Sequence, residues 1–389
     1  MDFELWYLIL VPLLFAAGWF ARSFDIKEKQ TIANEKDTLY KGVDLLLSNK
    51  QDQAIDAFIN LVKLDPDTVE MHFSLAGLFR RRGEFDRAIK IHNVLVNRED
   101  LPKKIRSRAL YELGEDYLKA GLWDRAEESF LKLSDTSESY KTIARKELLH
   151  IYETEKEWQK AIDEANIIQR QSGEDQSTRI AQLYCELTNQ NLYFKNFKGA
   201  AEALEKALKV DPNNKRALII KGKMLKAKGD IDGALATWKQ VGQISPAYET
   251  LVVEQIASLL LEAGRKEEAV RYLEDLFKDG STADEVDTAG ILLGKAGSSK
   301  EAIALIQEHL KTQPTLVAFY RLIDLRLADE PNNESLKQLH GLLKNLLSKA
   351  VRYKCTKCGF ATRKFLWRCP GCHQWESFPP VRQENLSGK

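Results

Sequence analysis

One phrase recurs along this chain at intervals near 34 residues: a turn residue, followed five positions later by an alanine. Five copies have glycine at the turn, and they begin at Gly83, Gly121, Gly229, Gly264 and Gly297. Three weaker copies begin at Asn49, Lys156 and Lys195. The eight alanines, Ala54, Ala88, Ala126, Ala161, Ala200, Ala234, Ala269 and Ala302, are separated by 34, 38, 35, 39, 34, 35 and 33 residues. Such a period predicts stacked helix pairs, because each pair can bury its apolar face only against its neighbours.

Each position of the phrase has a structural reason. A helix that ends in a left-handed residue favours glycine there, so we expect Lys156 and Lys195 to be strained or to use another turn. The alanine begins the second helix where the two helices cross closely. A small residue lies seven positions before the turn in most copies, and we expect it to face the alanine. These small residues are Gly42, Ala76, Gly114, Gly222, Ala257 and Gly290.

Two further positions complete the pattern. A large apolar residue four positions after the alanine lies one turn along the same helix face and is expected to pack between stacked pairs. These residues are Phe58, Phe130, Leu204, Trp238, Leu273 and Ile306. Prolines twelve positions after the alanine should end the second helix, at Pro66, Pro212, Pro246 and Pro314. The spacings of 38 and 39 predict extra loop residues before the third and fifth pairs.

With these offsets the sequence resembles the tetratricopeptide repeat family over about residues 35 to 330. We place the array at residues 35–348, as about eight to nine helix pairs, with its least regular part near residues 139–200. The resemblance implies a superhelix whose concave side, lined by the first helix of each pair, forms a groove for a peptide or helix of a partner. Cys185 is expected to be a buried thiol, and self-association is compatible with this architecture.

The N-terminus carries an uncharged apolar stretch from Leu5 to Ala21. Together with Phe3 it approaches the roughly 18 to 20 residues that cross a bilayer, so we predict a transmembrane anchor at residues 1–21 and a juxtamembrane linker at 22–34. A cleaved signal peptide and a buried core helix are the alternatives. Acidic residues precede the stretch and basic residues follow it, which predicts a single pass with the body in the cytoplasm.

Four of the five cysteines lie near the C-terminus as two C-x-x-C pairs, Cys355 with Cys358 and Cys369 with Cys372. Two such pairs facing each other supply a tetrahedral four-thiolate site, so we predict that these cysteines bind one metal ion, Fe or Zn. A redox C-x-x-C is the alternative, but it needs only one pair. The pattern resembles rubredoxin-like zinc ribbons, and we place this domain at residues 349–381, followed by a tail at 382–389.

Seven basic residues and no acidic one lie between Lys349 and Cys372. Part of this charge offsets the four thiolates. The excess predicts an anionic or partner-binding surface that includes Arg363, Lys364 and Arg368. The whole chain carries 58 basic and 57 acidic residues, so its overall charge indicates no particular partner.

The abundance of helix-forming residues and the order of these parts predict an all-α chain: a tetratricopeptide-repeat superhelix with an N-terminal transmembrane helix and a small C-terminal rubredoxin-like domain. As a whole the chain resembles the lipopolysaccharide assembly protein B family of Gram-negative bacteria. That resemblance implies a noncatalytic adaptor in the bacterial inner membrane that regulates lipopolysaccharide synthesis. The implied partners are a membrane-bound ATP-dependent metalloprotease, the lipid A pathway deacetylase, and inner-membrane lipopolysaccharide sensor and assembly proteins.

Two other functional classes stay open from the residues alone. A nucleic-acid-binding zinc ribbon on a repeat arm would use the basic residues, although a membrane tether gives it little access to nucleic acid. An enzyme or electron carrier is the other class. The sequence contains no H-E-x-x-H, G-x-S-x-G or phosphate-binding glycine loop, so an enzyme would need a site that no motif reveals.

Overall fold

A computed structural model of the chain describes residues 69–277, 282–349 and 352–380, together with Trp19, Arg22, Tyr40, Asp44, Leu45, Ser48, Gln53 and Ala54. The predicted anchor, linker and tail lie outside these residues, apart from Trp19 and Arg22. Within the part that is described, no helix combines the length and the apolar character needed to cross a membrane. The chain divides into two units, Met1–Gly173 and Glu174–Lys389.

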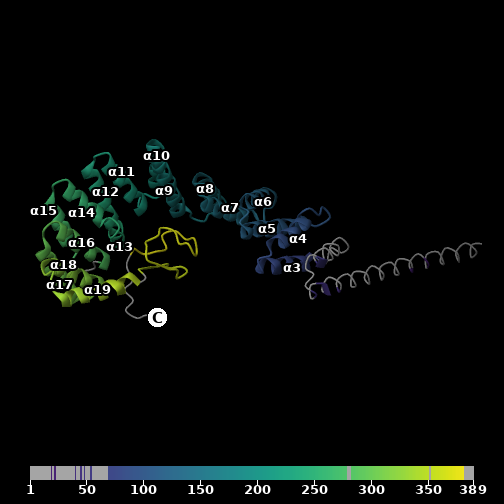
Figure 1. Cartoon of the computed structure of the whole chain (residues 1–389). Helices are drawn as coiled ribbons and strands as arrows, with labels where there is room; N and C mark the ends of the chain where they lie inside the picture. The colour runs from purple at the N-terminus through teal and green to yellow at the C-terminus, as the bar shows by residue number, and fades with distance from the viewer. Residues whose placement is uncertain are drawn as a thin grey trace, which may run out of the picture. The chain divides into compact units, whose positions relative to one another are not determined.

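The first unit consists of successive helix pairs (Figure 1). Its described helices are α3 (Val69–Arg81), α4 (Phe85–Val96), α5 (Lys103–Ala120), α6 (Trp123–Thr136), α7 (Lys141–Glu155) and α8 (Trp158–Ser172). In each pair a long helix turns sharply into a second one, and the apolar faces of the two helices pack together. The expected all-helical repeat architecture is therefore present here.

The second unit has the same arrangement of helix pairs. It ends in a small two-stranded domain at residues 352–380, drawn in yellow in Figure 1, which we call the knuckle. Its helices are α9 (Ser177–Tyr193), α10 (Phe197–Val210), α11 (Lys215–Ala227), α12 (Ile231–Ile244), α13 (Pro246–Glu249), α14 (Val253–Glu262), α15 (Lys266–Asp275), α16 (Ala283–Lys295), α17 (Ser299–Thr312), α18 (Leu316–Asp329) and α19 (Glu334–Lys349). Strands β1 (Tyr353–Lys354) and β2 (Ala361–Thr362) are antiparallel, with Tyr353 opposite Thr362.

The repeating phrase has the predicted conformation. All eight repeat alanines, from Ala54 to Ala302, are fully buried. The five turn glycines have φ values between 74° and 83°. Lys156 and Lys195 occupy the same left-handed position, with φ of 62° and 59°, so these two turns are strained as expected.

The small residue of the first helix has a different neighbour from the one expected. A Cβ on Gly222 would lie 2.2 Å from Nε1 of Trp238, and a Cβ on Gly114 would lie 2.6 Å from the ring of Phe130. Each glycine therefore makes room for the large residue four positions after the alanine, rather than for the alanine itself. An aromatic ring of this size can lie between the two helices only where the facing residue has no side chain.

The extra residues of the two long repeats are divided between loops and helices. Six residues, 97–102, precede α5, and α5 itself is 18 residues long. Before α9 the connection is only residues 173–176, the same length as the connection 211–214 before α11. The expected longer loop is absent there, because the additional residues extend α9 to 17 residues, compared with 13 in α11.

The prolines end helices as predicted in the described copies. Helix α10 ends two residues before Pro212, and α17 ends two residues before Pro314. Pro246 has a second role, because it begins the short helix α13. Its fixed φ suits the first position of a helix. The extra turn of α13 carries Tyr248, which contacts the C-terminal knuckle.

Candidate metal centre

The knuckle consists of two turns that repeat each other atom for atom in their hydrogen bonds. In the first, the amide of Lys357 donates to Sγ of Cys355 at 3.4 Å, and the amide of Gly359 donates to the Cys355 carbonyl at 3.0 Å. In the second, the amides of Gly371 and His373 make the same two bonds to Cys369, at 3.4 Å and 2.9 Å. The two turns thus present their sulfurs in the same way.

The last residue of each turn is left-handed. Gly359 has φ of 77°, and His373, at the equivalent position, has φ of 58°. His373 thus closes the second turn through its backbone. Its side chain is exposed.

The sulfur geometry fits one tetrahedral ion. All four Sγ atoms lie within 4.8 Å of one another. The distance from Cys355 to Cys372 is 3.7 Å, and that from Cys358 to Cys369 is 3.6 Å. Metal–sulfur bonds of about 2.3 Å in a tetrahedron place sulfurs about 3.8 Å apart, so small shifts of the side chains would let the four predicted ligands hold Zn or Fe.

The electrostatics of the thiols also favour a bound cation. Burial alone would raise the pKa of Cys355, but hydrogen bonds from Ser377 and from the amides of residues 358 and 357 lower this pKa to about 6. The amide of Gln374 would lower the pKa of Cys372, yet burial and the neighbouring thiols raise it to about 12. The thiolate of Cys355 thus forms readily, whereas the thiolate of Cys372 forms with difficulty, because thiolates so close together repel one another. A divalent ion removes this repulsion and stabilises all four thiolates.

The knuckle packs against the first helices of several repeats of the second unit, and we call this contact region the seat of the knuckle. Glu376 accepts a hydrogen bond from Gln182 of α9 at 2.8 Å and forms an ion pair with Lys215 of α11 at 3.0 Å. Gln182 is itself fully buried and accepts a hydrogen bond from Arg216 at 3.2 Å. At a third helix, the hydroxyl of Tyr353 reaches Asp284 of α16 at 3.4 Å.

Aromatic rings form the apolar part of this seat. The indole of Trp367 stacks on Tyr248 of α13 with centroids 5.8 Å apart, and Phe365 meets the same ring edge-on at 6.4 Å. The guanidinium of Arg216 lies 5.8 Å from the rings of both Trp367 and Trp375. Both Phe365 and Trp367 pack against the core of buried residues around α11–α15. The knuckle therefore covers helix faces that the repeat pattern alone predicts to line an open groove.

The basic residues that were singled out do not form this seat. Arg363 and Lys364 are exposed, and Arg368 is half-buried with its guanidinium 5.7 Å from the Trp375 ring. Sequence reasoning missed Glu376, Tyr248, Gln182 and Lys215. No local pattern marks them, since their partners lie more than a hundred residues away.

Together the paired helices and the four-cysteine knuckle define a class: tetratricopeptide-repeat proteins that end in a rubredoxin-like metal-binding domain. Family models agree on both parts. Residues 41–100 and 192–247 match the tetratricopeptide repeat, and residues 353–380 match the rubredoxin metal binding domain.

The chain belongs to the lipopolysaccharide assembly protein B family. It is 35% identical to lipopolysaccharide assembly protein B of Escherichia coli K12 over 380 residues, which cover 96% of this chain and 97% of the relative. The Haemophilus influenzae protein of the same name is 30% identical, with 97% of this chain and 98% of the relative covered. A tetratricopeptide repeat protein of Parabacteroides merdae, 17% identical, aligns over 72% of this chain and 100% of its own with a TM-score of only 0.32.

Proposed function

We propose that this chain is a membrane-anchored, noncatalytic adaptor that regulates lipopolysaccharide biosynthesis. In this proposal it promotes proteolysis of the lipid A pathway deacetylase by a membrane-bound ATP-dependent metalloprotease, and it supports lipopolysaccharide assembly. The observation that carries the proposal is the end-to-end similarity to relatives named for lipopolysaccharide assembly, in a chain that keeps both the repeats and the four-cysteine knuckle.

The structure supports an adaptor through the way the knuckle is fixed. Glu376, Trp367 and Tyr353 attach it to α11, α13 and α16, so the knuckle and these repeats of the second unit are held together as one binding surface. Two proteins that bind different parts of such a surface are held at a defined separation. Bringing a protease and its substrate together in this way raises their effective concentration without any chemistry by the adaptor.

The metal has a structural part in this proposal. Some 30 residues cannot bury enough apolar surface to fold alone, so Fe or Zn held by Cys355, Cys358, Cys369 and Cys372 would fold the knuckle and thereby complete its face toward the repeats. The bound ion supplies a cross-link between the two turns. The protein supplies the hydrogen bonds that hold each sulfur in place.

The anchor proposed at residues 1–21 places the chain in the bacterial inner membrane as a single-pass protein, with repeats and knuckle facing the cytoplasm. Confinement to the membrane plane brings the chain near a membrane-bound protease and near inner-membrane lipopolysaccharide sensor and assembly proteins. These partners follow from the family resemblance. Arg363 and Lys364, which are exposed on the knuckle, are the residues we propose for contact with a partner or an anionic surface.

The nucleic-acid alternative is weakened by the position of the aromatic rings. Proteins that bind single strands use exposed rings as stacking platforms. Here Phe365 and Trp367 pack on Tyr248, so these two rings are occupied within the chain.

The proposal is tested by following the deacetylase after translation is stopped, in cells that contain or lack this chain. We expect the chain to shorten the half-life of the deacetylase, and purified chain in proteoliposomes to accelerate its degradation by the metalloprotease without being consumed. Cys355→Ser combined with Cys358→Ser should abolish both effects, whereas Cys185→Ser, outside the knuckle, should retain them. An unchanged half-life without the chain would refute the proposal, and full activity of a form lacking residues 1–21 would remove the anchor from it.

A further inference from the structure

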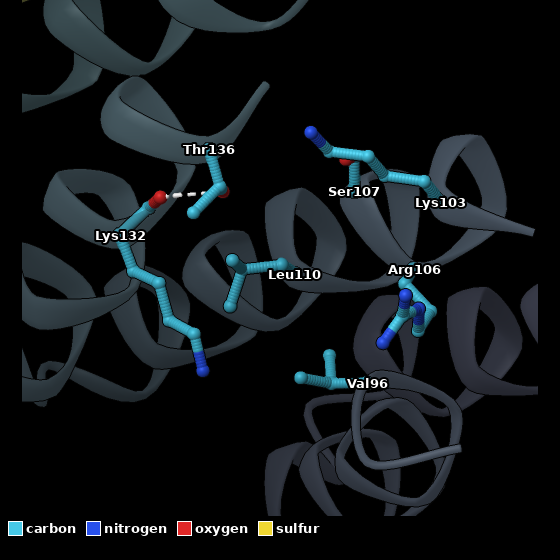
Figure 2. A pocket seen from close by; sticks show the side chains of 7 residues that line it. All are labelled: Val96, Lys103, Arg106, Ser107, Leu110, Lys132 and Thr136. Atoms are coloured by element: carbon cyan, nitrogen blue, oxygen red, sulfur yellow. Dashed lines mark hydrogen bonds between the residues drawn. The ribbon is translucent and has the colours of Figure 1, made fainter. Parts of the chain in front are cut away.

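A cavity of about 260 Å³ lies between α4, α5 and α6 of the first unit, far along the sequence from the cysteines (Figure 2). Val96 and Leu110 supply its apolar lining. Three cationic side chains line it: in Figure 2, Lys132 lies on one side of Leu110, and Lys103 and Arg106 lie on the other. The remaining lining residues are Ser107 and Thr136, and the Thr136 hydroxyl already donates to the carbonyl of Lys132 at 2.6 Å; none of the described residues that line the cavity is acidic.

Among the residues that the structure describes, the cations of this cavity have no anionic partner. Nε of Arg106 is buried and has no hydrogen-bond partner within the described residues. Neither Lys103 nor Lys132 forms an ion pair in that part of the chain. By contrast, two other arginines of the same unit are paired with carboxylates: Arg80 with Asp116 and Arg98 with Asp100. A buried donor without a partner costs free energy, so an unmade bond at Arg106 needs a reason.

The start of α5 gives a second, independent indication. The helix begins Lys103-Lys104-Ile105-Arg106, its first turn contains no acidic residue, and the side chain of Pro102 offers no cap. The N-terminal end of a helix carries a partial positive charge, so cations there are unfavourable. Three basic residues in this turn therefore destabilise the helix unless an anion lies beside them.

We propose that this cavity is a binding site for a phosphoryl group, carried by a small molecule or by a lipid headgroup. A phosphate monoester has a charge near −2 at neutral pH and several strong acceptor oxygens, which suits three cations and the hydroxyl of Ser107. Arg106 supplies a planar donor that matches phosphate geometry, and Lys103 and Lys132 neutralise the remaining charge. The cavity size admits one small anionic group. This site is separate from the proposed adaptor function and stands or falls independently of it.

The test is isothermal titration calorimetry on the full-length chain in a nonionic detergent, with inorganic phosphate and, separately, with dihexanoyl phosphatidic acid. We expect saturable one-site binding that weakens as salt is raised. Comparable affinity for both ligands would identify a free phosphoryl compound, and preference for phosphatidic acid would identify a lipid headgroup. Arg106→Gln should weaken binding about tenfold to a hundredfold.

Matched variants separate this site from general surface charge. Lys132→Gln, at an exposed position, should weaken binding without threatening the fold. Lys104→Gln removes an equal charge from the same turn but does not line the cavity, and binding should be retained. At the same concentration, ligand should also raise the thermal midpoint of the wild-type chain by more than that of Arg106→Gln. Absence of saturable binding by either ligand, or an equal loss in Lys104→Gln, would overturn the proposal.

Discussion

The indole of Trp367 stacks on the ring of Tyr248, with centroids 5.8 Å apart and ring planes inclined by 25°. Tyr248 belongs to α13, the single turn that Pro246 begins between two repeats. The ammonium of Lys215 lies 5.4 Å from the same ring. The tyrosine therefore receives an aromatic ring from the knuckle and a cation from α11, which makes it the apolar centre of the seat.

Trp367→Ala should loosen the knuckle from the repeats. Loss of the stacked indole is expected to cost about 1 to 3 kcal/mol of docking free energy. Hydrogen exchange measured by mass spectrometry should become faster in peptides from α11 and α13, while Trp367→Phe retains part of the protection. Tyr193→Ala removes a ring that is 83% exposed and should leave these peptides unchanged. Equal protection in Trp367→Ala would show that the stack contributes little.

The purified chain should contain one Zn or Fe ion per molecule, measured by elemental analysis. Cys355→Ser with Cys358→Ser should contain none, because two of the four ligands are lost. The fifth cysteine, Cys185, is buried on α9 and is not one of the four sulfurs that lie together, so Cys185→Ser should retain one ion. Removal of the ion by a chelator should unfold the knuckle and shift the fluorescence of Trp367 and Trp375 to longer wavelength. A knuckle that stays docked without metal would contradict the structural role of the ion.

Gly222→Ala should destabilise the second unit, since its Cβ would lie 2.2 Å from Nε1 of Trp238. Trp238 is fully buried and donates a hydrogen bond to the carbonyl of Ile219 at 3.1 Å, so it cannot move away freely. We expect a loss of about 1 to 3 kcal/mol in urea unfolding. Gly341→Ala is the matched control: no atom lies within 4 Å of its Cβ, and it should gain about 0.5 to 1 kcal/mol. Similar effects of the two changes would refute the close approach of Gly222 and Trp238.

A buried carboxyl makes the second unit sensitive to pH. Burial raises the pKa of Glu285 from 4.5 to about 7, although hydrogen bonds from Thr282 act in the opposite direction. The pKa of Glu285 is thus higher in the folded chain than in the unfolded chain, so binding of a proton stabilises the folded state. This stabilisation is fully present below the pKa of the unfolded chain. It is lost as the pH rises through about 7.

Glu285→Gln keeps an oxygen that can accept from the amide of Thr282 but cannot ionise. We expect it to be more stable than the wild type by about 1 to 3 kcal/mol at pH 8, and by less than about 1 kcal/mol at pH 5. Urea unfolding at both pH values measures this difference. Glu301→Gln, at an exposed position on α17, should show a change that does not grow with pH. If the stability difference between Glu285→Gln and the wild type became smaller toward pH 8, the raised pKa of Glu285 would be contradicted.

Much of the fold could be predicted because its signals are local. The turn glycines, the buried alanines and the strain at Lys156 and Lys195 each follow from positions a few residues apart. The two C-x-x-C turns could be paired for the same reason, since ten residues separate them.

The seat of the knuckle could not be predicted in this way. The contacts of Glu376 with Gln182 and Lys215 depend on the curvature of the intervening repeats, which no short pattern encodes. Pro246 was interpreted only as the end of a helix, so the turn it begins, and Tyr248 within it, had no predicted role. Gly222 was correctly predicted to lie where two helices approach closely, but its neighbour is Trp238 and not the predicted alanine. Spacing in the sequence indicates which helix face a residue occupies, and it does not indicate the size of the side chain that packs there.

Glu376 is joined to Gln182 across 194 positions and to Lys215 across 161. A ribosome therefore releases α9, α11 and α13 long before it makes the segment that covers them. Contacts between such distant positions form late, because a long loop must close first. In each new molecule, Tyr248 and its neighbours are exposed to water until this segment has been made. In a product that terminates before residue 376, they stay exposed. Translation through residue 376 is thus the step that completes these contacts.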